Sequence, residues 1–433
     1  MINISGRKKF WIGIALINLA IVAVLGFVLR SKILFSMPFI DYKNTLHAHS
    51  HFAFGGWVTV ALLTLLTYEV LPVSMNRKPV YKWFLAGILL AAIGMLVSFP
   101  VQGYGFYSIF FSTLLVFVTY GYSYVFIKDV LKTKNSKTIK LLSIASVIYL
   151  VISSVGPFTL AYLLATKSGN AFLYRDSIYT YLHLQYNGFF TLAIMALLFN
   201  RIEHLLPKAG LNKAYKFAHI LNITVLPSMF LCYLWHYPNT LFRVIALAGS
   251  LSLVVCTVYF FITAYSIRSV LEKTTKPVKI IGLTALAAFT LKMAMQAFTI
   301  FPALGHLIFS NRPMIIAFLH LVLLGFVSLY LIAHFLYAGY MPTNRRSITA
   351  VYVFTFAVVA NEVVLFMQGT GVMFMTNSAL YAQLLWATGA ALLGGAILMV
   401  RSYYTAYPKS KPVIPVQQKS IIESQRKNYN KYE

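Results

Sequence analysis

Three segments of this 433-residue chain share one short pattern: a histidine, four residues, then a glycine followed by an aromatic residue. The pattern begins at His51, His183 and His320, and each copy opens a long apolar stretch. The neutral imidazole of histidine is a strong ligand for haem iron and for copper. Because polar groups are costly to bury in a membrane, histidines inside apolar segments are candidates for function. The three histidines are therefore the first candidate metal ligands.

The composition predicts a membrane protein. Hydrophobic residues make up 59% of the chain and charged residues only 10%, with a mean hydropathy of +0.75, which excludes an ordinary soluble globule. We expect an all-α membrane protein with twelve spanning helices of about twenty apolar residues each. The expected spans are 10–29, 46–70, 80–99, 105–127, 140–165, 177–199, 214–236, 241–267, 278–300, 313–337, 347–367 and 377–401. Four spans separate successive histidine patterns, which indicates a four-helix module used three times.

The net charge of +27 predicts topology rather than nucleic-acid binding, because lysines and arginines gather on alternate connections together with both termini. By the positive-inside rule that side is cytoplasmic, and the three pattern histidines then lie toward the outer face. No cleavable signal peptide is expected, since the first apolar stretch is long enough to be the first span. We expect one transmembrane domain over 1–405, a disordered basic cytoplasmic tail over 406–433, and a multi-pass location in a bacterial-type inner membrane with lipid as its surroundings.

The second expected span begins with three histidines at alternate positions. On an α-helix His47 and His51 share a face, whereas His49 points roughly the opposite way. Either His47 or His51 could ligate a metal, while the other holds a haem propionate or a supporting group. The sequence leaves this choice open.

The other candidate histidines differ in their surroundings. His320 has only apolar neighbours along its helix, so nothing adjacent in sequence satisfies its ring. His183 is followed by Gln185, Tyr186 and Asn187, so a polar network could hold it without a metal. His236 ends its helix and is a candidate partner of His183 at a second metal.

Two charged residues lie alone inside apolar spans. Lys292 falls near the middle of the ninth span, and Glu362 is a carboxylate well inside the eleventh. A charge at such depth needs an opposite charge, water or a shifted protonation equilibrium. We therefore expect Lys292 to face the interior and consider both residues for a proton path or an ion pair.

Several stretches resemble subunit I of the haem-copper oxidase superfamily, above all its nitric oxide reductase and C-type oxidase branches. Residues 317–325 keep the frame of helix 10 in that family, and residues 290–292 resemble a Ser-Ile-Lys run on helix 9. Residues 46–56 resemble helix 2 of the C-type proteins but are one residue short. The run after His183 resembles helix 6, again offset by one residue.

This resemblance implies twelve helices in three four-helix arcs and a low-spin haem b between His320 and either His47 or His51. The haem would be non-covalent, because neither cysteine lies in a Cys-x-x-Cys-His motif. A second metal, copper or another, has as its candidate ligands His183, His236 and His49. The implied function is electron transfer, or reduction or sensing of oxygen or nitric oxide, with a cytochrome c-type or other redox subunit as partner.

The chain departs from the family at the catalytic centre. Phe318 stands where the family has the high-spin haem ligand, and His236 is followed by Tyr237 rather than by a second histidine. Oxygen or nitric oxide reduction needs an open haem beside a second metal, so enzymatic activity stays open. The alternatives are a twelve-helix transporter of the major facilitator type or a scaffold subunit without cofactors. The transporter predicts two six-helix halves, whereas the histidine pattern divides the chain by four.

Overall fold

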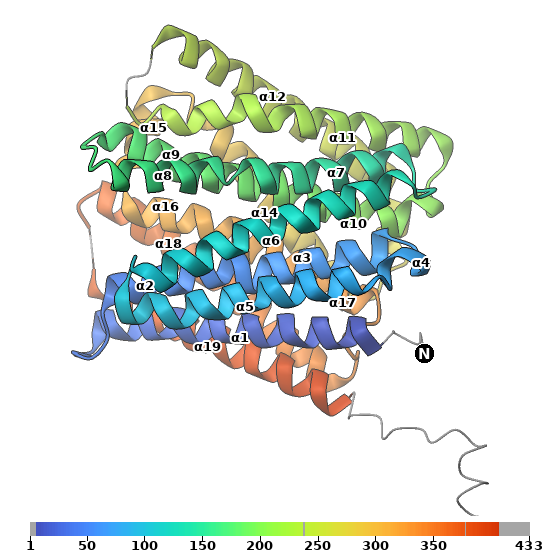
Figure 1. The fold of residues 1–433 in the computed structure, drawn as a ribbon, viewed down its shortest axis with the longest axis horizontal. Helices are drawn as coiled ribbons and strands as arrows, with labels where there is room; N and C mark the ends of the chain where they lie inside the picture. Colours follow the sequence, from blue (N-terminus) through green and yellow to red (C-terminus); the bar gives the residue numbers. More distant parts are fainter. Residues whose placement is uncertain (1–5, 237–238, 377, 407–433) are drawn as a thin grey trace, which may run out of the picture.

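The structure, a computed structural model, describes residues 6–236, 239–376 and 378–406 as a bundle of long helices that run back and forth (Figure 1). The helices are α1 Gly6–Leu34, α2 Tyr42–Phe52, η1 Ala53–Thr59, α3 Val60–Leu65, η2 Leu66–Val70, α4 Val73–Asn76, α5 Pro79–Gln102, α6 Phe106–Leu131, α7 Lys137–Ile152, α8 Val155–Ala165, α9 Ala171–His183, η3 Leu184–Phe190, α10 Thr191–Ile202, η4 Glu203–Leu205, α11 Lys208–Met229, η5 Phe230–Tyr233, α12 Thr240–Ser266, α13 Arg268–Glu272, α14 Lys276–Phe298, α15 Pro302–Ser310, α16 Arg312–His320, η6 Leu321–Ser328, α17 Leu329–Tyr337, α18 Arg345–Met373 and α19 Ala379–Ala406.

Eleven helices in this part of the chain are long and apolar enough to cross a membrane. They match eleven of the twelve expected spans, so the all-α, multi-pass membrane class is confirmed. The remaining span, expected at 214–236, forms α11 and η5 and packs against α7 and α12, but it is not among the eleven. The first half of α11 carries Lys213, Lys216 and His219, which lower its hydropathy. The tail expected at 406–433 lies, apart from Ala406, outside the described residues.

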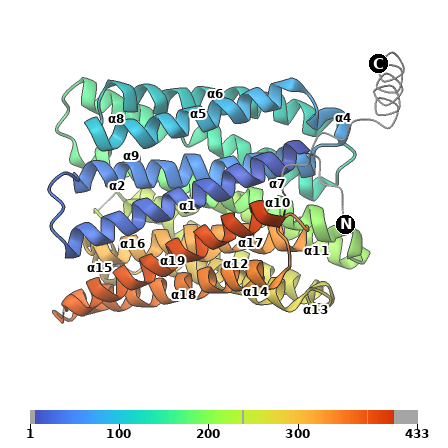
Figure 2. The ribbon, with the colours of Figure 1, turned by 90° about the horizontal axis from the view of Figure 1, so that it is seen from below.

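The first and last helices define the two ends of the bundle. α1 begins and α19 ends at the same end (Figures 1 and 2), which we call the terminus end. The helices that carry the histidine pattern begin at the opposite end, which we call the histidine end.

The three helices that carry the histidine pattern form the centre of the bundle. Over the most apolar stretch of 18 residues in each helix, the buried share is 94% in Tyr42–Val70, 89% in Ala171–Leu205 and 61% in Arg312–Tyr337. Among the other eight spans this share lies between 22% and 56%. The pattern therefore identifies three inner helices, and the other helices surround them.

The same pattern also coincides with a change of helix type. One or two residues after each pattern histidine the α-helix opens into a π-helical segment, η1, η3 or η6. A π-helix bonds each N–H five residues back, is rare, and occurs mostly as single turns at functional sites. Three such segments at corresponding places show that the sequence repeat is a structural repeat.

The pattern glycines let an outer helix approach two of these π-helical segments. A Cβ atom at Gly188 would lie 2.5 Å from the Cβ of Tyr149 on α7, and one at Gly325 would lie 3.2 Å from the Cβ of Ala288 on α14. In the remaining copy, Asn18 of α1 donates to the Gly56 carbonyl at 2.6 Å. Outer helices thus pack against the three inner helices at the π-helical turns.

One buried carboxylate joins the inner helices near the terminus end. Glu69, with 2% of its side chain exposed, lies 2.8 Å from the Arg201 guanidinium and 3.1 Å from Nε2 of His334. Arg201 also donates to the Tyr340 phenol, as does Lys8 of α1 at 3.0 Å. Burial, and then the Glu69 carboxylate, raise the pKa of Tyr340, so this phenol keeps its proton. Glu69, Arg201 and His334 each come from a different inner helix, and we call them the inner-helix junction.

The close contact at Gly188 predicts opposite effects for two glycine substitutions. Gly188→Ala should destabilise the fold by about 1–3 kcal/mol, because its Cβ would overlap Tyr149. Gly282→Ala is the matched control: no atom lies within 4 Å of the added Cβ, so alanine should stabilise α14 by up to about 1 kcal/mol. Unfolding in mixed detergent micelles measures both, and equal effects would contradict the packing described.

The inner-helix junction predicts a large loss of stability when the Glu69 carboxylate is replaced by an amide of the same shape. Glu69→Gln keeps the shape of the side chain but leaves Arg201 and the buried His334 without their carboxylate. The free energy of unfolding should fall by up to about 3–5 kcal/mol. Solvent screening at the partly exposed Arg201 reduces this loss. Glu203→Gln should change stability by under about 0.5 kcal/mol, because Glu203 is partly exposed and, among the described hydrogen bonds, its carboxylate accepts from Ser136 alone. A Glu69→Gln protein as stable as Glu203→Gln would show that the junction does not hold the helices.

Candidate functional site

Two histidines from different inner helices lie within electrostatic range of each other at the histidine end. His320, the last residue of α16, interacts electrostatically with His49 of α2. Nδ1 of His49 donates to the Val22 carbonyl at 3.2 Å, and Nδ1 of His320 donates to the Ile316 carbonyl at 2.8 Å. A proton fixed on Nδ1 leaves the Nε2 lone pair available as a ligand, and metal-binding histidines are oriented in this way.

The histidine pair is half-buried, and α1 packs closely against His49. Their helix neighbours Ala48 and Ala317 are buried. A Cβ atom built on Gly26 of α1 would lie 3.2 Å from Cε1 of His49. Glycine at this position therefore lets α1 pass close to the imidazole.

A cation from α1 accompanies the pair. Arg30 interacts electrostatically with both His49 and His320, and also with Tyr42 and Glu362. Among the described residues no ion pair joins Arg30 to Glu362, whose carboxylate accepts instead from Asn361 at 3.2 Å. The guanidinium thus lies within electrostatic range of both imidazoles and of the Glu362 carboxylate.

His47 and His51 face another helix. As expected from helical spacing they share one side of α2, where His51 stacks on Phe99 with ring centroids 4.4 Å apart. Both rings also contact Tyr104, whose hydroxyl lies 3.3 Å from Nε2 of His51. The structure therefore places His47 and His51 against α5 and the turn after it, whereas His49 is turned toward the Val22 carbonyl of α1.

His183 lies at the end of a hydrogen-bonded chain. Its Nδ1 accepts from the Gln296 amide at 3.1 Å and from the Asn187 amide at 3.2 Å. Its proton is then on Nε2, which donates to the Val225 carbonyl at 2.8 Å. Both ring nitrogens are engaged, so a metal at His183 would have to replace one of these bonds.

Lys292 belongs to the same chain and, as expected, faces the interior. Its side chain is fully buried, and its amine donates to Oδ1 of Asn187 at 2.7 Å and to the Thr191 hydroxyl at 3.0 Å. The rings of Tyr186, Phe289 and Phe326 lie 5.6 to 5.7 Å from it. Within the described ranges no carboxylate reaches ion-pair distance, so Lys292 and Glu362 do not form the pair that the sequence allowed.

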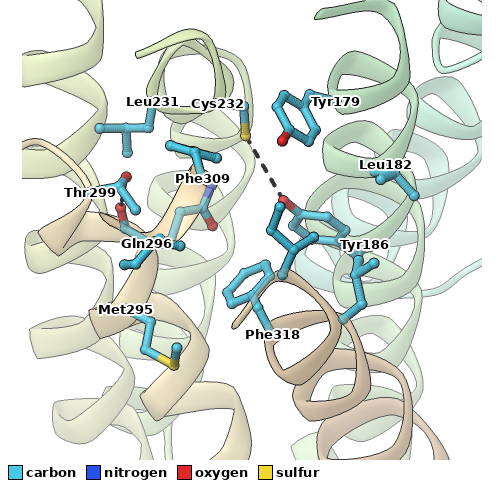
Figure 3. Close-up of a pocket in the computed structure, with 13 residues that line it drawn as sticks. Tyr179, Leu182, Tyr186, Leu231, Cys232, Met295, Gln296, Thr299, Phe309 and Phe318 are labelled. Carbon is cyan, nitrogen blue, oxygen red and sulfur yellow. Dashed lines mark hydrogen bonds between the residues drawn. The ribbon is translucent and has the colours of Figure 1, made fainter. Parts of the chain in front are cut away.

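An apolar cavity of about 70 Å³ lies beside this chain, between α9, η5, α14 and α16 (Figure 3). Phe318 and Tyr186 line it with their rings 5.7 Å apart. The Tyr186 hydroxyl lies 4.0 Å from Sγ of Cys232 (Figure 3). Phe318 thus faces this cavity, whereas His320, two residues later, is not among the residues that line it.

His236 is engaged at the histidine end. Its Nε2 lies 2.9 Å from the Asp176 carboxylate, which also accepts from the Trp235 indole at 2.8 Å. Arg175 stacks over Trp235 and donates to the Phe309 carbonyl at 2.6 Å. These contacts tie α9 to the chain after η5 and to α15. Over the residues that the structure describes, no three His, Cys, Asp or Glu side chains come together as a metal site.

No model of a known protein family matches this sequence, and no curated protein is similar enough to count as a relative. The chemistry of the site is therefore argued from its own residues.

The chain from Lys292 to His183 predicts a strong energetic coupling. Asn187→Leu removes one of the two acceptors of a buried amine and a partner of Gln296, and should destabilise the fold by about 3–5 kcal/mol. Adding Lys292→Met removes the stranded amine, so the double variant should recover a large part of that loss. Asn222→Leu is the control, because the buried Oδ1 of Asn222 has no partner. A double variant with the summed single losses would contradict the coupling.

Proposed function

We propose that this chain is a membrane protein that binds one b-type haem between His49 and His320. The observation that carries the proposal is the pair itself. Two imidazoles from different inner helices lie within electrostatic range, each with Nδ1 fixed by a carbonyl and Nε2 free of hydrogen bonds among those described. Two axial imidazoles are a sufficient donor set for a six-coordinate haem.

The neighbours of the pair fit the rest of such a cofactor. Gly26 removes a side chain that would crowd His49, and Arg30 supplies a cation for a propionate. Once bound, the haem would supply a one-electron redox centre. The protein would fix both imidazole orientations, shield the ring from water and set its potential through Arg30 and the apolar surroundings.

The histidine pair supports the oxidase-like interpretation of the sequence, with one change in the expected haem ligands. That reading paired His320 with His47 or His51, and the geometry favours His49. We infer electron transfer as the principal activity, with reduction or sensing of oxygen or nitric oxide as its extension and a cytochrome c-type or other redox subunit as its partner. Phe318 at the apolar cavity and the engaged nitrogens of His183 do not favour a second metal there.

The arrangement in the membrane follows from the same proposal. We infer that α11 is a twelfth span, because the chain passes from one end of the bundle to the other along it. The terminus end would then face the cytoplasm, by the charge distribution, and the haem would lie toward the outer face of a bacterial-type inner membrane. The repeat of the inner helices favours three four-helix arcs.

The haem prediction is tested by an optical spectrum of protein made in a haem-sufficient host. Reduced protein should show the sharp visible bands of a six-coordinate b-type haem. His49→Ala and His320→Ala should lose the haem, or turn it five-coordinate so that it binds carbon monoxide. His47→Ala and His51→Ala are matched controls on the same helix and should keep the wild-type spectrum.

Two results would overturn the proposal in different ways. Wild-type protein without Soret absorbance would favour a cofactor-free scaffold. A haem that survives His49→Ala but not His47→Ala or His51→Ala would move the ligand to the other face of α2.

A further inference from the structure

A second cavity, of about 40 Å³, lies between two of the inner helices and the outer helices α6 and α7, apart from the histidine pair and the apolar cavity. We call it the polar cavity. Its wall carries five Ser, Thr or Gln side chains that are at most 4% exposed, namely Thr59, Thr119, Ser153, Ser154 and Gln185. The polar cavity can hold a small ion together with a water molecule, because one water molecule needs about 10–15 Å³.

Three interruptions of regular α-helix meet at the polar cavity. Thr59 ends η1, and Gln185 belongs to η3. Ser153 and Ser154 form the break between α7 and α8, near the middle of a span of 29 residues. Pro157 explains this break, since it has no N–H for the Ser153 carbonyl four residues earlier. π-helical turns occur mostly at functional sites, and broken helices of membrane transporters bind cations near the middle of the bilayer. The backbone at the polar cavity is thus of the kind that binds ions.

The backbone engages most of the hydroxyl protons at the wall. The Thr119, Ser153 and Ser154 hydroxyls each donate to the carbonyl three residues earlier, at 2.6 to 2.7 Å. Because Ser154 uses its proton in this way, the Tyr120 phenol must donate in its contact with the Ser154 hydroxyl. A hydroxyl that donates to a backbone carbonyl offers only its lone pairs to other groups. These three oxygens are therefore acceptors toward the cavity.

Two further oxygens at the wall are left without a donor. The Gln185 amide nitrogen donates to the Ser153 hydroxyl at 2.8 Å, which leaves the amide oxygen Oε1 as an acceptor. None of the described hydrogen bonds reaches this oxygen or the Thr59 hydroxyl, although both side chains are only 4% exposed. Burying a polar group without a partner is costly. The polar cavity therefore favours an occupant that accepts lone pairs from oxygen.

The chemistry of the wall narrows the occupant to a cation of single charge. Hard cations prefer oxygen ligands, and protein sites for Ca²⁺ and Mg²⁺ normally include carboxylates. None of the described residues at this wall is an Asp or Glu. His51 also lies at the wall, but its Nε2 meets the Tyr104 hydroxyl at 3.3 Å. Hydroxyl and amide oxygens without a carboxylate fit a monovalent ion, and the small volume favours sodium.

We propose that the polar cavity binds a sodium ion through the oxygens of Thr59, Thr119, Ser153, Ser154 and Gln185. The ion links α6 and the break between α7 and α8 to two inner helices at their π-helical segments. The site does not rest on the haem proposal, because the described contacts of these five residues do not include the histidine pair. The competing explanation is that water alone fills the cavity.

Equilibrium binding of radioactive sodium to the purified protein in choline buffer tests the site. Thr59→Val removes one oxygen and keeps the shape of the side chain, so sodium affinity should fall at least about tenfold, the effect of one lost bond to a charged group. Thr64→Val is the matched control on the same inner helix. The buried Thr64 hydroxyl also has no partner, but Thr64 does not line the cavity, so affinity should stay at the wild-type value.

Three results of the binding experiment overturn the proposal. The first is wild-type protein without saturable sodium binding, which is the result expected when water alone fills the cavity. The second is displacement of the bound sodium by calcium as readily as by unlabelled sodium. The third is an equal loss of affinity in Thr59→Val and Thr64→Val.

Thermal unfolding in detergent keeps the proposal falsifiable if Thr59→Val does not fold. A ligand that binds only the folded protein stabilises it, so sodium in place of choline at equal ionic strength should raise the unfolding temperature of the wild type. At about one hundred times the dissociation constant, a tenfold loss of affinity halves this rise, and Ser154→Ala should show that loss. Ser146→Ala is the control, because its hydroxyl also donates to the carbonyl three residues earlier but lies away from the cavity. A wild type that sodium stabilises no more than choline, or equal rises in the two variants, overturns the site.

Discussion

The arrangement depends on one buried carboxylate that serves three helices. In hydrocarbon, helices gain little from hiding apolar surface, so packing and polar contacts must hold them together. Glu69 meets Arg201 and His334, and with them closes the three inner helices into one unit. The charge of Glu69 is tolerable only because two partners and the Tyr340 phenol surround it. Every compartment described above lies between two of the helices that this junction positions.

The three inner helices create three compartments with different chemistry. One gap holds His49 and His320, and the gap beside α14 holds the apolar cavity and Lys292. The gap beside α6 and α7 holds a cavity of about 40 Å³ whose wall carries His51, Thr59 and Ser153. The backbone repeats, because all three helices share a histidine, a π-helical segment and a glycine. The side chains do not repeat, and the differences between compartments follow from them. The same threefold arrangement thus encloses one polar gap, one apolar gap and one gap that holds a pair of histidines.

The sequence predicted the membrane-spanning helices better than it predicted the contacts of the candidate histidines. Apolar length and the histidine spacing located the spans and singled out the inner helices, because both are properties of single segments. The choice among His47, His49 and His51 depends on whether α1 or α5 lies alongside, which no spacing within α2 reveals. The junction was missed because Glu69, Arg201 and His334 come from three distant segments. A signal was present, since each follows a pattern histidine by about four to five helical turns.

The π-helical segments also affect how this chain can be compared with others. A π-helical turn contains one residue more than an α-helical turn, so deleting a single residue there can restore an α-helix while both flanking faces keep their directions. In an ordinary α-helix the same deletion would rotate everything beyond it by about 100°. Residue counting therefore fails across the π-helical segments η1, η3 and η6. These segments are places at which insertions and deletions can accumulate without altering the bundle, and alignments of such chains need gaps inside helices.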